Sequence, residues 1–561
     1  MADSAQISDE LVFLPLGGCE EIGMNLNAYG YGPAHARRWI LVDVGVTFGS
    51  LDTPGIDLIC ADPDYLIGEQ IDAIFLTHAH EDHIGAVGLL YPRLQTKAPI
   101  YATPFTTELV RSKMLERGVD PRWLKPVALG GTVVAGPFSV TYVTLTHSIP
   151  EPNALAIETP AGMILHTGDW KIDPDPQIGG PTDIKGLTAL GDRGVLAMVC
   201  DSTNVFEEGE SGSEETVKQG LIELIAQQKQ AVAVTTFASN VARVKSIIEA
   251  AELAGRSVCL VGRSMHRITD AAKAVGILPR NMEFVNEADA SSIPAENILY
   301  LCTGSQGEAR AALARIARKD HRNVSLHEGD CVIFSCRIIP GNEREIFQLQ
   351  NSLADQGVRI ITPRMVKDPI HVSGHPCRGE LQRMYQWVRP EIAVPVHGER
   401  RHIVEHAAYA KSLQVPQSIA PRNGSLVRLA PGKAEIIDLV PAGRLYLDGK
   451  FLVPEGAQGI NERRKLAENG FVLASVVIDE AGDVIDGPVV VVRGFSEADG
   501  RLADESLDEL DEAAENAVQK MKRKTRLEDD LVEREIGRAL RKACDSTFGR
   551  RPMIDVTVLR S

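Results

Sequence analysis

The sequence predicts an α/β protein in which a body of packed sheets is interrupted by an inserted parallel α/β domain and followed by a small α/β domain. Its 561 residues are too many for one hydrophobic core, so roughly two to four domains are expected. Short apolar segments separated by Gly- and Pro-rich turns fill the chain up to about residue 201. Strand-like and helix-like segments then alternate regularly from about residue 211, and irregular sequence near residue 441 precedes the last block.

Residues 1–210 are expected to form the first part of one domain. The apolar segments with β-forming residues predict strands over Leu11–Leu16, Trp39–Val44, Ala73–Leu76, Phe138–Leu145, Met163–His166 and Leu196–Cys200. Few helices interrupt them, and Pro104–Arg117 is one. Because strands outnumber helices, we expect sheets packed face to face with helices outside.

Residues 211–370 change to the rhythm of a parallel sheet with crossover helices. Ser211-Gly212-Ser213-Glu214 has the spacing of a capping box ahead of a helix over 217–228. Ligand-type residues return near His371, followed by a predicted strand over Ile392–Val396. The region 211–370 is therefore interpreted as an insertion, after which the first domain resumes over 371–440.

Residues 441–466 contain several prolines and glycines and are expected to be an irregular linker. The block 467–561 is expected to be a small C-terminal α/β domain with one long charged helix over Leu507–Lys542. The basic run Met521–Arg526 either contacts RNA or forms a solvated helix face, and its acidic flanks favour the solvated face.

Composition excludes some classes of protein. The net charge of −17 and the 5% aromatic content argue against a broadly basic, base-stacking surface, although a nuclease with its positive charge confined to a channel stays possible. Nine scattered cysteines without a C-x-x-C pair indicate reduced thiols. Met1–Glu10 lacks a signal-peptide pattern, and no apolar stretch approaches the roughly 18 residues of a membrane span. We expect a cytoplasmic protein with no membrane association.

The segment Thr77-His78-Ala79-His80-Glu81-Asp82-His83 carries the strongest chemical signal. An apolar strand precedes it and a helix-like segment follows from Ile84, which places it on a loop at the carboxyl end of a strand. Three imidazoles and a carboxylate at this spacing are typical of a site for two divalent ions. The alternative, a polar loop with surface histidines, does not explain the spacing.

Four distant residues, Asp43, His147, Asp169 and His397, lie at the ends of predicted strands, and strand ends on one edge converge. Any one of them alone is more often structural. Zn²⁺ suits these imidazole and carboxylate ligands best, with Mn²⁺ possible, and a hydroxide between the two ions is the expected nucleophile. Asp43 is expected to orient a histidine or the hydroxide from behind the ligands. The expected assignment is His78, His80 and His147 for one ion, Asp82, His83 and His397 for the other, and Asp169 as the bridge.

These motifs together resemble the metallo-β-lactamase fold, an αββα sandwich, and the insertion resembles that of the β-CASP group of nucleases. Within that group the chain is similar to the bacterial ribonuclease J family over nearly its whole length. The motifs that carry the resemblance, besides residues 77–83, are Leu16–Asn25, His147–Pro150, Thr167–Asp169, Asp201–Asn204, Pro340–Glu343, His371–His375 and Val396–Glu399.

The resemblance implies that the segment His371-Val372-Ser373-Gly374-His375 contacts an RNA phosphate through His371, Ser373, Gly374 and His375. His375 would be a proton donor or charge stabiliser, acting beside Asp82 and Asp169 as the catalytic residues.

The resemblance also implies a place for the 5′ nucleotide of the RNA at Ser239 and Asn240. Read without the family, these two residues cap a helix over Val241–Ala254, and both roles are compatible because a helix start favours a phosphate. Asp201 matches an acidic motif associated with the insertion and would support the ligands.

The implied activity is hydrolysis of single-stranded RNA by the bridging hydroxide, giving 5′-phosphate and 3′-hydroxyl products. A 5′-to-3′ exonuclease that prefers 5′-monophosphate ends, with endonuclease activity, would serve rRNA processing and mRNA decay. The family also suggests a homodimer or dimer of dimers, and partners in an RNA-degradation complex. A monomer stays open.

Three other functions remain as alternatives. A small-molecule hydrolase of this fold does not need the insertion. A DNA-processing β-CASP enzyme tends to carry an apolar residue where this chain has His397. A catalytically inert RNA-binding protein usually lacks some of the ligands that this chain retains.

Overall fold

The computed structural model describes residues 9–50, 52–339, 341–497 and 502–561. Pro340 of the motif above and residues 1–8 of the amino terminus lie outside this part. Contacts divide the chain into two units, one of residues up to 47 with 59–444 and one of residues 48–58 with 445–561. Among the described helices, none combines the length and the apolar content that a membrane crossing requires.

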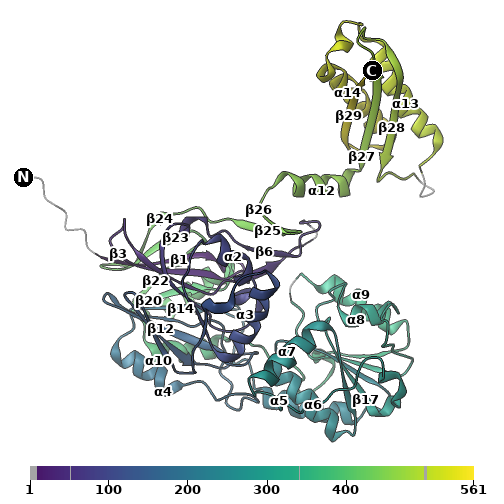
Figure 1. Cartoon of the computed structure of the whole chain (residues 1–561). Coiled ribbons are helices and arrows are strands. Elements are labelled where there is room, and N and C mark those ends of the chain that lie inside the picture. Colours follow the sequence, from purple (N-terminus) through teal and green to yellow (C-terminus); the bar gives the residue numbers. More distant parts are fainter. Residues whose placement is uncertain (1–8, 51, 340, 498–501) are drawn as a thin grey trace, which may run out of the picture. The chain divides into compact units, whose positions relative to one another are not determined.

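Two sheets form the body of the first unit (Figure 1). In spatial order, the first sheet contains β24 (Glu435–Leu439), β23 (Ser425–Ala430), β1 (Glu10–Gly17), β3 (Leu26–Gly32), β4 (Arg38–Val42), β7 (Gln70–Phe75), β8 (Ile100–Ala102) and β9 (Leu124–Pro126). The second contains β10 (Thr132–Ala135), β11 (Phe138–Thr144), β12 (Asn153–Thr159), β13 (Gly162–His166), β14 (Ala197–Asp201), β20 (Ile392–Val396) and β22 (Gln417–Ser418). Strand β20 lies beyond the insertion in sequence yet pairs with β14, so the chain returns to the sheet that it left.

One apolar core lies between these sheets, because Phe13 and Phe75 of the first and Tyr142 and Leu155 of the second belong to the same buried cluster. The outer face of the second sheet packs against α4 (Ile184–Arg193) and α10 (Arg378–Val388), and α11 (Arg400–Ser412) contacts β20. The short α1 (Glu81–Ile84) precedes α2 (Val87–Arg93), which packs on α3 (Pro104–Glu116) beside β8 and β9. This is the expected αββα sandwich.

The insertion contains the expected parallel sheet, with its helices on both faces (Figure 1). Its strands, in spatial order, are β16 (Ser257–Val261), β17 (Ile298–Cys302), β15 (Val232–Thr235), β18 (Cys331–Phe334) and β19 (Arg359–Ile361). The helices α5 (Glu214–Ala226), α6 (Val241–Leu253) and α7 (Arg263–Ala274) contribute to one buried cluster, and α8 (Ala312–Ala317) and α9 (Glu343–Ala354) to the other.

The start of α5 differs from the expected capping box. The cap is Ser213, whose hydroxyl accepts from the Glu215 amide, rather than Ser211. Ser211 instead donates its hydroxyl to Glu380. Both oxygens of the Glu214 carboxylate accept hydrogen bonds from Arg243, so this side chain does not bond to the backbone at the start of the helix as a capping box requires.

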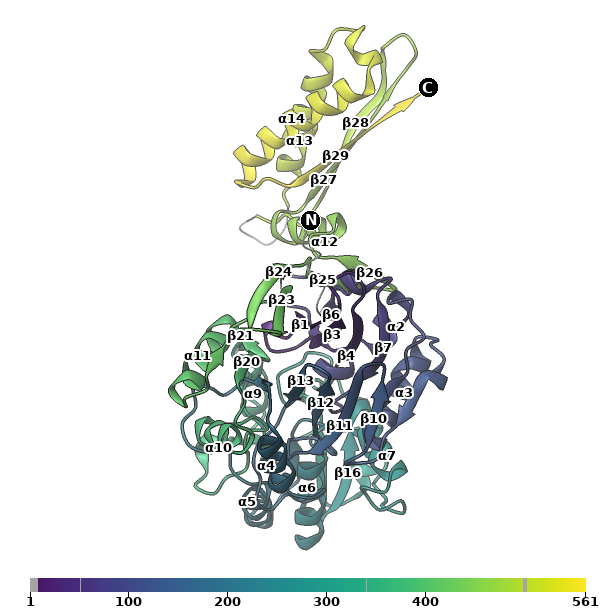
Figure 2. The same cartoon turned by 90° about the vertical axis from the view of Figure 1, so that its left-hand side faces the viewer.

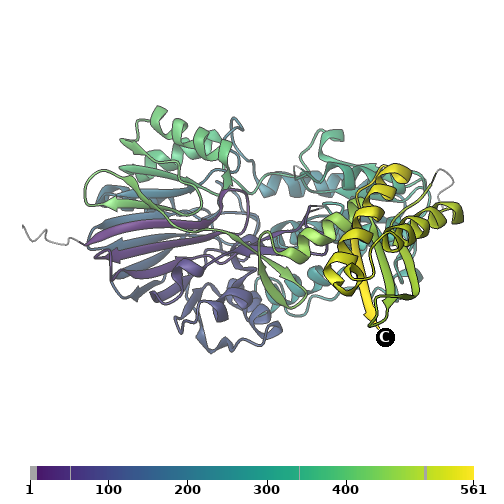
Figure 3. The ribbon, with the colours of Figure 1, turned by 90° about the horizontal axis from the view of Figure 1, so that it is seen from above.

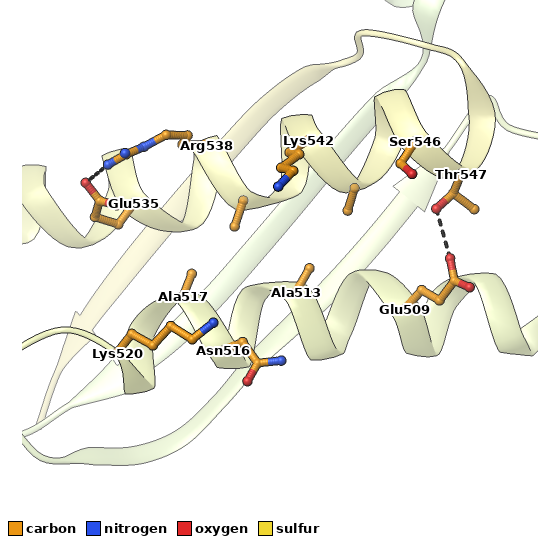
Figure 4. A pocket seen from close by; sticks show the side chains of 12 residues that line it. Glu509, Ala513, Asn516, Ala517, Lys520, Glu535, Arg538, Lys542, Ser546 and Thr547 are labelled. Atoms are coloured by element: carbon orange, nitrogen blue, oxygen red, sulfur yellow. Dashed lines mark hydrogen bonds and ion pairs between the residues drawn. The ribbon is translucent and has the colours of Figure 1, made fainter.

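The second unit contains a three-stranded sheet in which β27 (Phe471–Ile478) pairs with β28 (Val484–Arg493) and β29 (Met553–Arg560). Two helices of this unit, α13 (Asp504–Gln519) and α14 (Asp529–Phe548), lie on one side of the sheet (Figure 2). In Figure 3 the yellow ribbon follows α14 into β29, which ends the chain. An open hollow of about 570 Å³ between α13 and α14 is lined by residues that include Ala513, Ala517, Lys520 and Glu535 (Figure 4).

The expected single helix over Leu507–Lys542 was wrong. Both helices direct apolar residues, such as Leu510 and Ile536, into the core of this unit. One straight helix over those 36 residues would be about 54 Å long, whereas the eight-residue strand β27 spans about 27 Å, so one helix cannot keep both apolar stripes on the sheet.

The expectation that residues 441–466 are irregular was also wrong. Residues 441–466 contain β25 (Arg444–Asp448), β26 (Phe451–Pro454) and most of α12 (Gln458–Asn469). The two strands form an antiparallel hairpin whose turn includes Gly449, with a positive φ of 60°. The glycine therefore marks a hairpin turn rather than an irregular connection.

Candidate metal centre

The candidate ligands lie at the carboxyl ends of strands. His78–His83 follow β7, Asp169 follows β13, and His397 directly follows β20. The strands β13, β14 and β20 are parallel neighbours, so their carboxyl ends meet at one edge of the second sheet. Three groups of residues there place their ligand atoms within 4.8 Å of one another: His78, His80, His147 and Asp169; Asp82, His83, Asp169 and His397; Asp169, Asp201, His375 and His397.

The first group contains three imidazoles. Nδ1 of His80 lies 3.1 Å from Nε2 of His78 and 3.0 Å from Nε2 of His147. Tetrahedral Zn²⁺ with ligand bonds of about 2.0–2.1 Å separates its ligand atoms by about 3.3 Å, which these distances approach. Burial lowers the pKa of His78 and His147 well below the usual range and that of His80 to about 4. The rings are therefore neutral at pH 7, as metal ligands must be.

The second group adds a carboxylate to two imidazoles. Oδ2 of Asp82 lies 3.1 Å from Nε2 of His397 and 3.5 Å from Nε2 of His83. Burial alone lowers the pKa of His83 and His397, but Asp169 and the other nearby carboxylates outweigh it and raise both well above the usual range. The carboxylates around the second group therefore favour the protonated, positively charged rings of His83 and His397.

Asp169 belongs to both groups. Its Oδ2 lies 3.2 Å from Nε2 of His83 and 3.6 Å from Nε2 of His397, and 3.8 Å and 3.9 Å from the corresponding atoms of His78 and His147. Its Oδ1 is buried and accepts no hydrogen bond from the described residues. An unpartnered buried carboxylate oxygen is costly in free energy unless a cation lies beside it. The side chains present therefore fit divalent cations.

Asp43 orients one histidine of each group. Its carboxylate accepts from Nδ1 of His83 at 2.7 Å and from the Thr77 hydroxyl at 2.9 Å. Because that hydroxyl donates to Asp43, it accepts from Nδ1 of His78 at 3.0 Å. Both rings are then fixed with Nε2 turned toward the other candidate ligands, and the side-chain nitrogen of Asn25 lies 3.2 Å from Nε2 of His83. Asp43 was expected from the sequence to orient a histidine, whereas Thr77 was not singled out.

Asp201 and Thr203 form a second arrangement of this kind. One oxygen of Asp201 accepts from the Thr203 hydroxyl at 2.7 Å, which leaves that hydroxyl to accept from Nδ1 of His397 at 2.8 Å. The other oxygen accepts from Nδ1 of His375 at 2.8 Å. Burial lowers the pKa of His375, but Asp201 and Asp169 raise it above the usual value. Thr203 was missed, although it lies beside Asp201 in a motif visible in the sequence.

The segment from His371 to His375 lies against the ligands. Nδ1 of His147 donates to the carbonyl of Gly374 at 2.5 Å, and Asn204 donates to the Ser373 hydroxyl at 2.8 Å. A Cβ at Gly374 would lie 2.7 Å from the Ser148 hydroxyl oxygen and 2.9 Å from Cε1 of His147. Only glycine fits at this position.

Ser239 and Asn240 are connected differently. The Asn240 side chain accepts from the Arg243 amide at 2.9 Å and donates to Glu214 at 3.2 Å, so it caps α6 within the insertion. Within the described residues, no hydrogen bond or ion pair joins Ser239 or Asn240 to the candidate ligands.

Four family models match the chain along its length. They are described as Beta-lactamase superfamily domain (residues 38–187), Ribonuclease J, beta-CASP domain (229–353), Zn-dependent metallo-hydrolase RNA specificity domain (361–419) and Ribonuclease J C-terminal domain (458–561).

Curated relatives match almost the whole chain. Ribonuclease J of Sinorhizobium meliloti is 45% identical over 561 residues, covering 100% of this chain and 98% of that protein. Ribonuclease J of Corynebacterium glutamicum is 37% identical, covering 97% and 75%, and that of Thermus thermophilus is 34% identical, covering 97% and 94%. A solved structure of a protein of unknown function from Enterococcus faecalis shares the fold, with a TM-score of 0.51 and 17% identity, covering 75% of this chain and 100% of that one.

Proposed function

This chain belongs to the ribonuclease J family, and from that premise we propose that this metal-dependent ribonuclease cuts single-stranded RNA both from its 5′ end and internally. The observation that carries the proposal is the sharing of Asp169 between two ligand groups, against which the His371–His375 segment is held. A substrate phosphate lying between that segment and the ligands would meet both at once.

Two divalent ions, Zn²⁺ first and Mn²⁺ second, are the proposed cofactors. When bound, such ions activate water as a nucleophile and stabilise the negative charge that develops on a phosphate during hydrolysis. The proposed assignment keeps His78, His80 and His147 for one ion, Asp82, His83 and His397 for the other, and Asp169 for both.

The chain's own proton chemistry falls to His375. Asp201 and Asp169 raise its pKa against the effect of burial, which favours the protonated ring, and Asp201 fixes Nδ1 at 2.8 Å. The opposite ring nitrogen is then a donor that can protonate the departing ribose 3′ oxygen or stabilise charge on the phosphate. Cleavage of that P–O bond leaves a 3′ hydroxyl and a 5′ phosphate.

The test compares RNAs of one sequence carrying a 5′ monophosphate, a 5′ triphosphate or a 5′ hydroxyl, labelled at either end, with a DNA of the same sequence. Release of 5′ nucleotides from the monophosphate RNA together with internal cuts in all three RNAs is the expected result. Asp82→Ala and His83→Ala should each abolish cleavage with the fold retained by circular dichroism. Cleavage of DNA at the same rate, or full activity in both variants, would overturn the proposal.

Membership of the ribonuclease J family also suggests how the protein assembles and where it acts. We propose a homodimer or dimer of dimers in the cytoplasm that acts in rRNA processing and mRNA decay, with partners in an RNA-degradation complex. Light scattering of the full chain at several concentrations tests the oligomeric state, and a mass of 60.9 kDa throughout would contradict it.

A further inference from the structure

Arg243 is a buried cation to which the mechanism above gives no role. It lies in α6 with 0% of its surface exposed. Its Nε and Nη2 donate to the two oxygens of Glu214, both at 2.8 Å. Burying such a pair costs desolvation free energy, and apolar residues of similar size often give equal stability. Stability alone therefore does not account for the pair.

The remaining nitrogen of the guanidinium faces the segment that leads to the metal centre. Nη1 donates to the carbonyl and the hydroxyl of Ser335 at 3.0 and 2.9 Å, and lies 3.3 Å from the carbonyl of Ile370. It also lies 3.4 Å from Nδ1 of His371. One side chain thus joins α6, the residue after β18, and the start of the His371–His375 segment.

The contact between Nη1 of Arg243 and Nδ1 of His371 determines which ring nitrogen of His371 carries the proton. A guanidinium only donates hydrogen bonds and has no lone pair to offer. An Nδ1–H on His371 would point at another N–H, so Nδ1 must be the unprotonated nitrogen. Burial and Arg243 also lower the pKa of His371 to about 3, so the ring is neutral. A neutral ring without a proton on Nδ1 carries it on Nε2 and is a donor there.

We propose that Arg243 is a positioning residue that holds His371 as the Nε2–H tautomer, so that this ring donates a hydrogen bond to a phosphate oxygen of the RNA. The inference rests on the proposed function for its ligand, but the tautomer itself does not. A phosphate oxygen is only an acceptor, so the opposite tautomer would turn a lone pair toward negative charge.

Hydrogen bonds and an ion pair also connect Glu214, the partner of Arg243, with the loop that carries His147. The Glu214 amide donates to Asp173 at 2.9 Å, and Lys171 lies 3.2 Å from the same carboxylate oxygen. The carbonyl of Lys171 accepts from the hydroxyl of Thr146, which precedes His147. The charged groups that influence His371 are Arg243, Glu214, Arg337 and Lys171.

The direct test is the tautomer in the full-length protein. Histidine labelled with ¹⁵N is measured by NMR at pH 7, and the His371 signal is assigned by its loss in His371→Gln. The expected spectrum shows an unprotonated Nδ1 and a protonated Nε2. An Nδ1–H tautomer or a charged ring would overturn the proposal. This experiment uses no RNA, so it stands even if the chain proved not to cleave RNA.

The functional test uses Arg243→Lys, which keeps the charge but cannot contact Glu214, Ser335 and His371 together. We expect the KM for 5′-monophosphate RNA to rise about tenfold with a smaller change in kcat. The matched control is Arg256→Lys, the same change at a buried arginine of the insertion that binds only carbonyls, such as those of Gln230 and Ile298. Its KM should stay within about twofold of wild type.

A second comparison separates positioning from general structure. Gln at position 371 carries an N–H donor that does not depend on a tautomer, so His371→Gln should keep more RNA affinity than His371→Ala. Arg243→Lys should then change the KM of the His371→Gln protein by less than about twofold. An equal tenfold loss in that background, or in Arg256→Lys, would show a merely structural role and overturn the proposal. If Arg243→Lys does not fold, the NMR measurement on the wild type still decides.

Discussion

The two ligand groups of the centre share Asp169 but differ in charge. His78 and His147 are buried with the half-buried His80 beside them, and the pKa values of all three are lowered, so the group is neutral. His83 and His397 are equally buried, yet neighbouring carboxylates raise their pKa values. The same residue type in one cluster thus has pKa shifts of opposite sign, because the partner carboxylates, rather than burial, decide the direction of the shift.

This difference means that one group is ready to receive a cation at pH 7 and the other must first lose protons. It also identifies Asp169 as the only candidate ligand that both proposed sites have in common among the described residues. Five substitutions, a calorimetric titration and a thermal-unfolding series can break or sharpen the comparison, beginning with the residue that joins the groups.

Asp169→Asn should have the largest effect. The amide keeps the shape of the carboxylate but removes the charge that both groups use, so both cations should be lost and cleavage should fall by about 10³-fold or more. Metal content after dialysis and the rate of cleavage of labelled RNA measure this. Retention of more than a tenth of the activity would show that Asp169 does not join the sites.

His80→Ala and His397→Ala should each remove one cation and leave the other. We expect close to one metal ion per chain in each variant, with activity lowered by about 10²-fold or more because one of two sites is empty. Metal analysis by mass spectrometry distinguishes this from total loss. If either variant lost both ions, the two groups would be a single cooperative site.

Proton release should distinguish the groups at pH 7. Metal binding to His397→Ala, which keeps the neutral group, should release almost no protons. Binding to His80→Ala, which keeps His83 and His397 protonated, should release about one to two. Calorimetric titration of metal-free protein in two buffers with different ionisation enthalpies measures the number. Equal release in both variants would contradict the difference in charge.

The metal-free protein should show the matching pH dependence of stability. For His83 and His397 the folded pKa is raised, so their contribution is fully present below about pH 6.5 and is lost as the pH rises through the folded value. For His78, His80 and His147 the folded pKa is lowered. Their contribution is present above about pH 6.5 and is lost as the pH falls through the folded values. Thermal unfolding in chelator, from pH 5 to 9, should therefore show a smaller loss of stability toward high pH in His397→Ala than in His80→Ala. The loss toward low pH should be smaller in His80→Ala.

Thr77→Val and Asp43→Asn should have the smallest effects. Loss of the Thr77 hydroxyl frees Nδ1 of His78 only, whereas Asp43→Asn disturbs His78 and His83 together. Groups behind metal ligands typically change affinity by about 10–100-fold. Thr77→Val should therefore weaken only the neutral group, as read by competition with a metal indicator. Equal weakening of both groups by Thr77→Val would contradict the arrangement.

Much of the fold could be predicted from periodicity. The expected strands over Leu11–Leu16 and Phe138–Leu145 are β1 and β11, because alternating or apolar β-forming runs between Gly and Pro turns are local signals. The prediction of one helix over Leu507–Lys542 was wrong because apolar residues recur with the same helical period in α13 and in α14. The sequence pattern therefore does not mark the break between the two helices. Only the limited length of the sheet beneath requires two helices.

The candidate site divides in the same way. Residues that carry chemistry in a recognisable spacing, such as His78, His80 and His83, were visible in the sequence. Thr77, Thr203 and Arg243 were not, since threonine and arginine are common and their roles here depend on which atoms they face.

The sequence by itself determined the residue types, the strand ends that carry them and the family to which the chain belongs. Only the tertiary structure decided which imidazoles are neutral, which carboxylate is shared, and that Arg243 faces His371. The physical reason is that ligand spacing and strand periodicity are local properties of the chain. The protonation of the histidines and the direction of their hydrogen bonds depend instead on burial and on charged residues that lie hundreds of positions away in the sequence but close by in the fold.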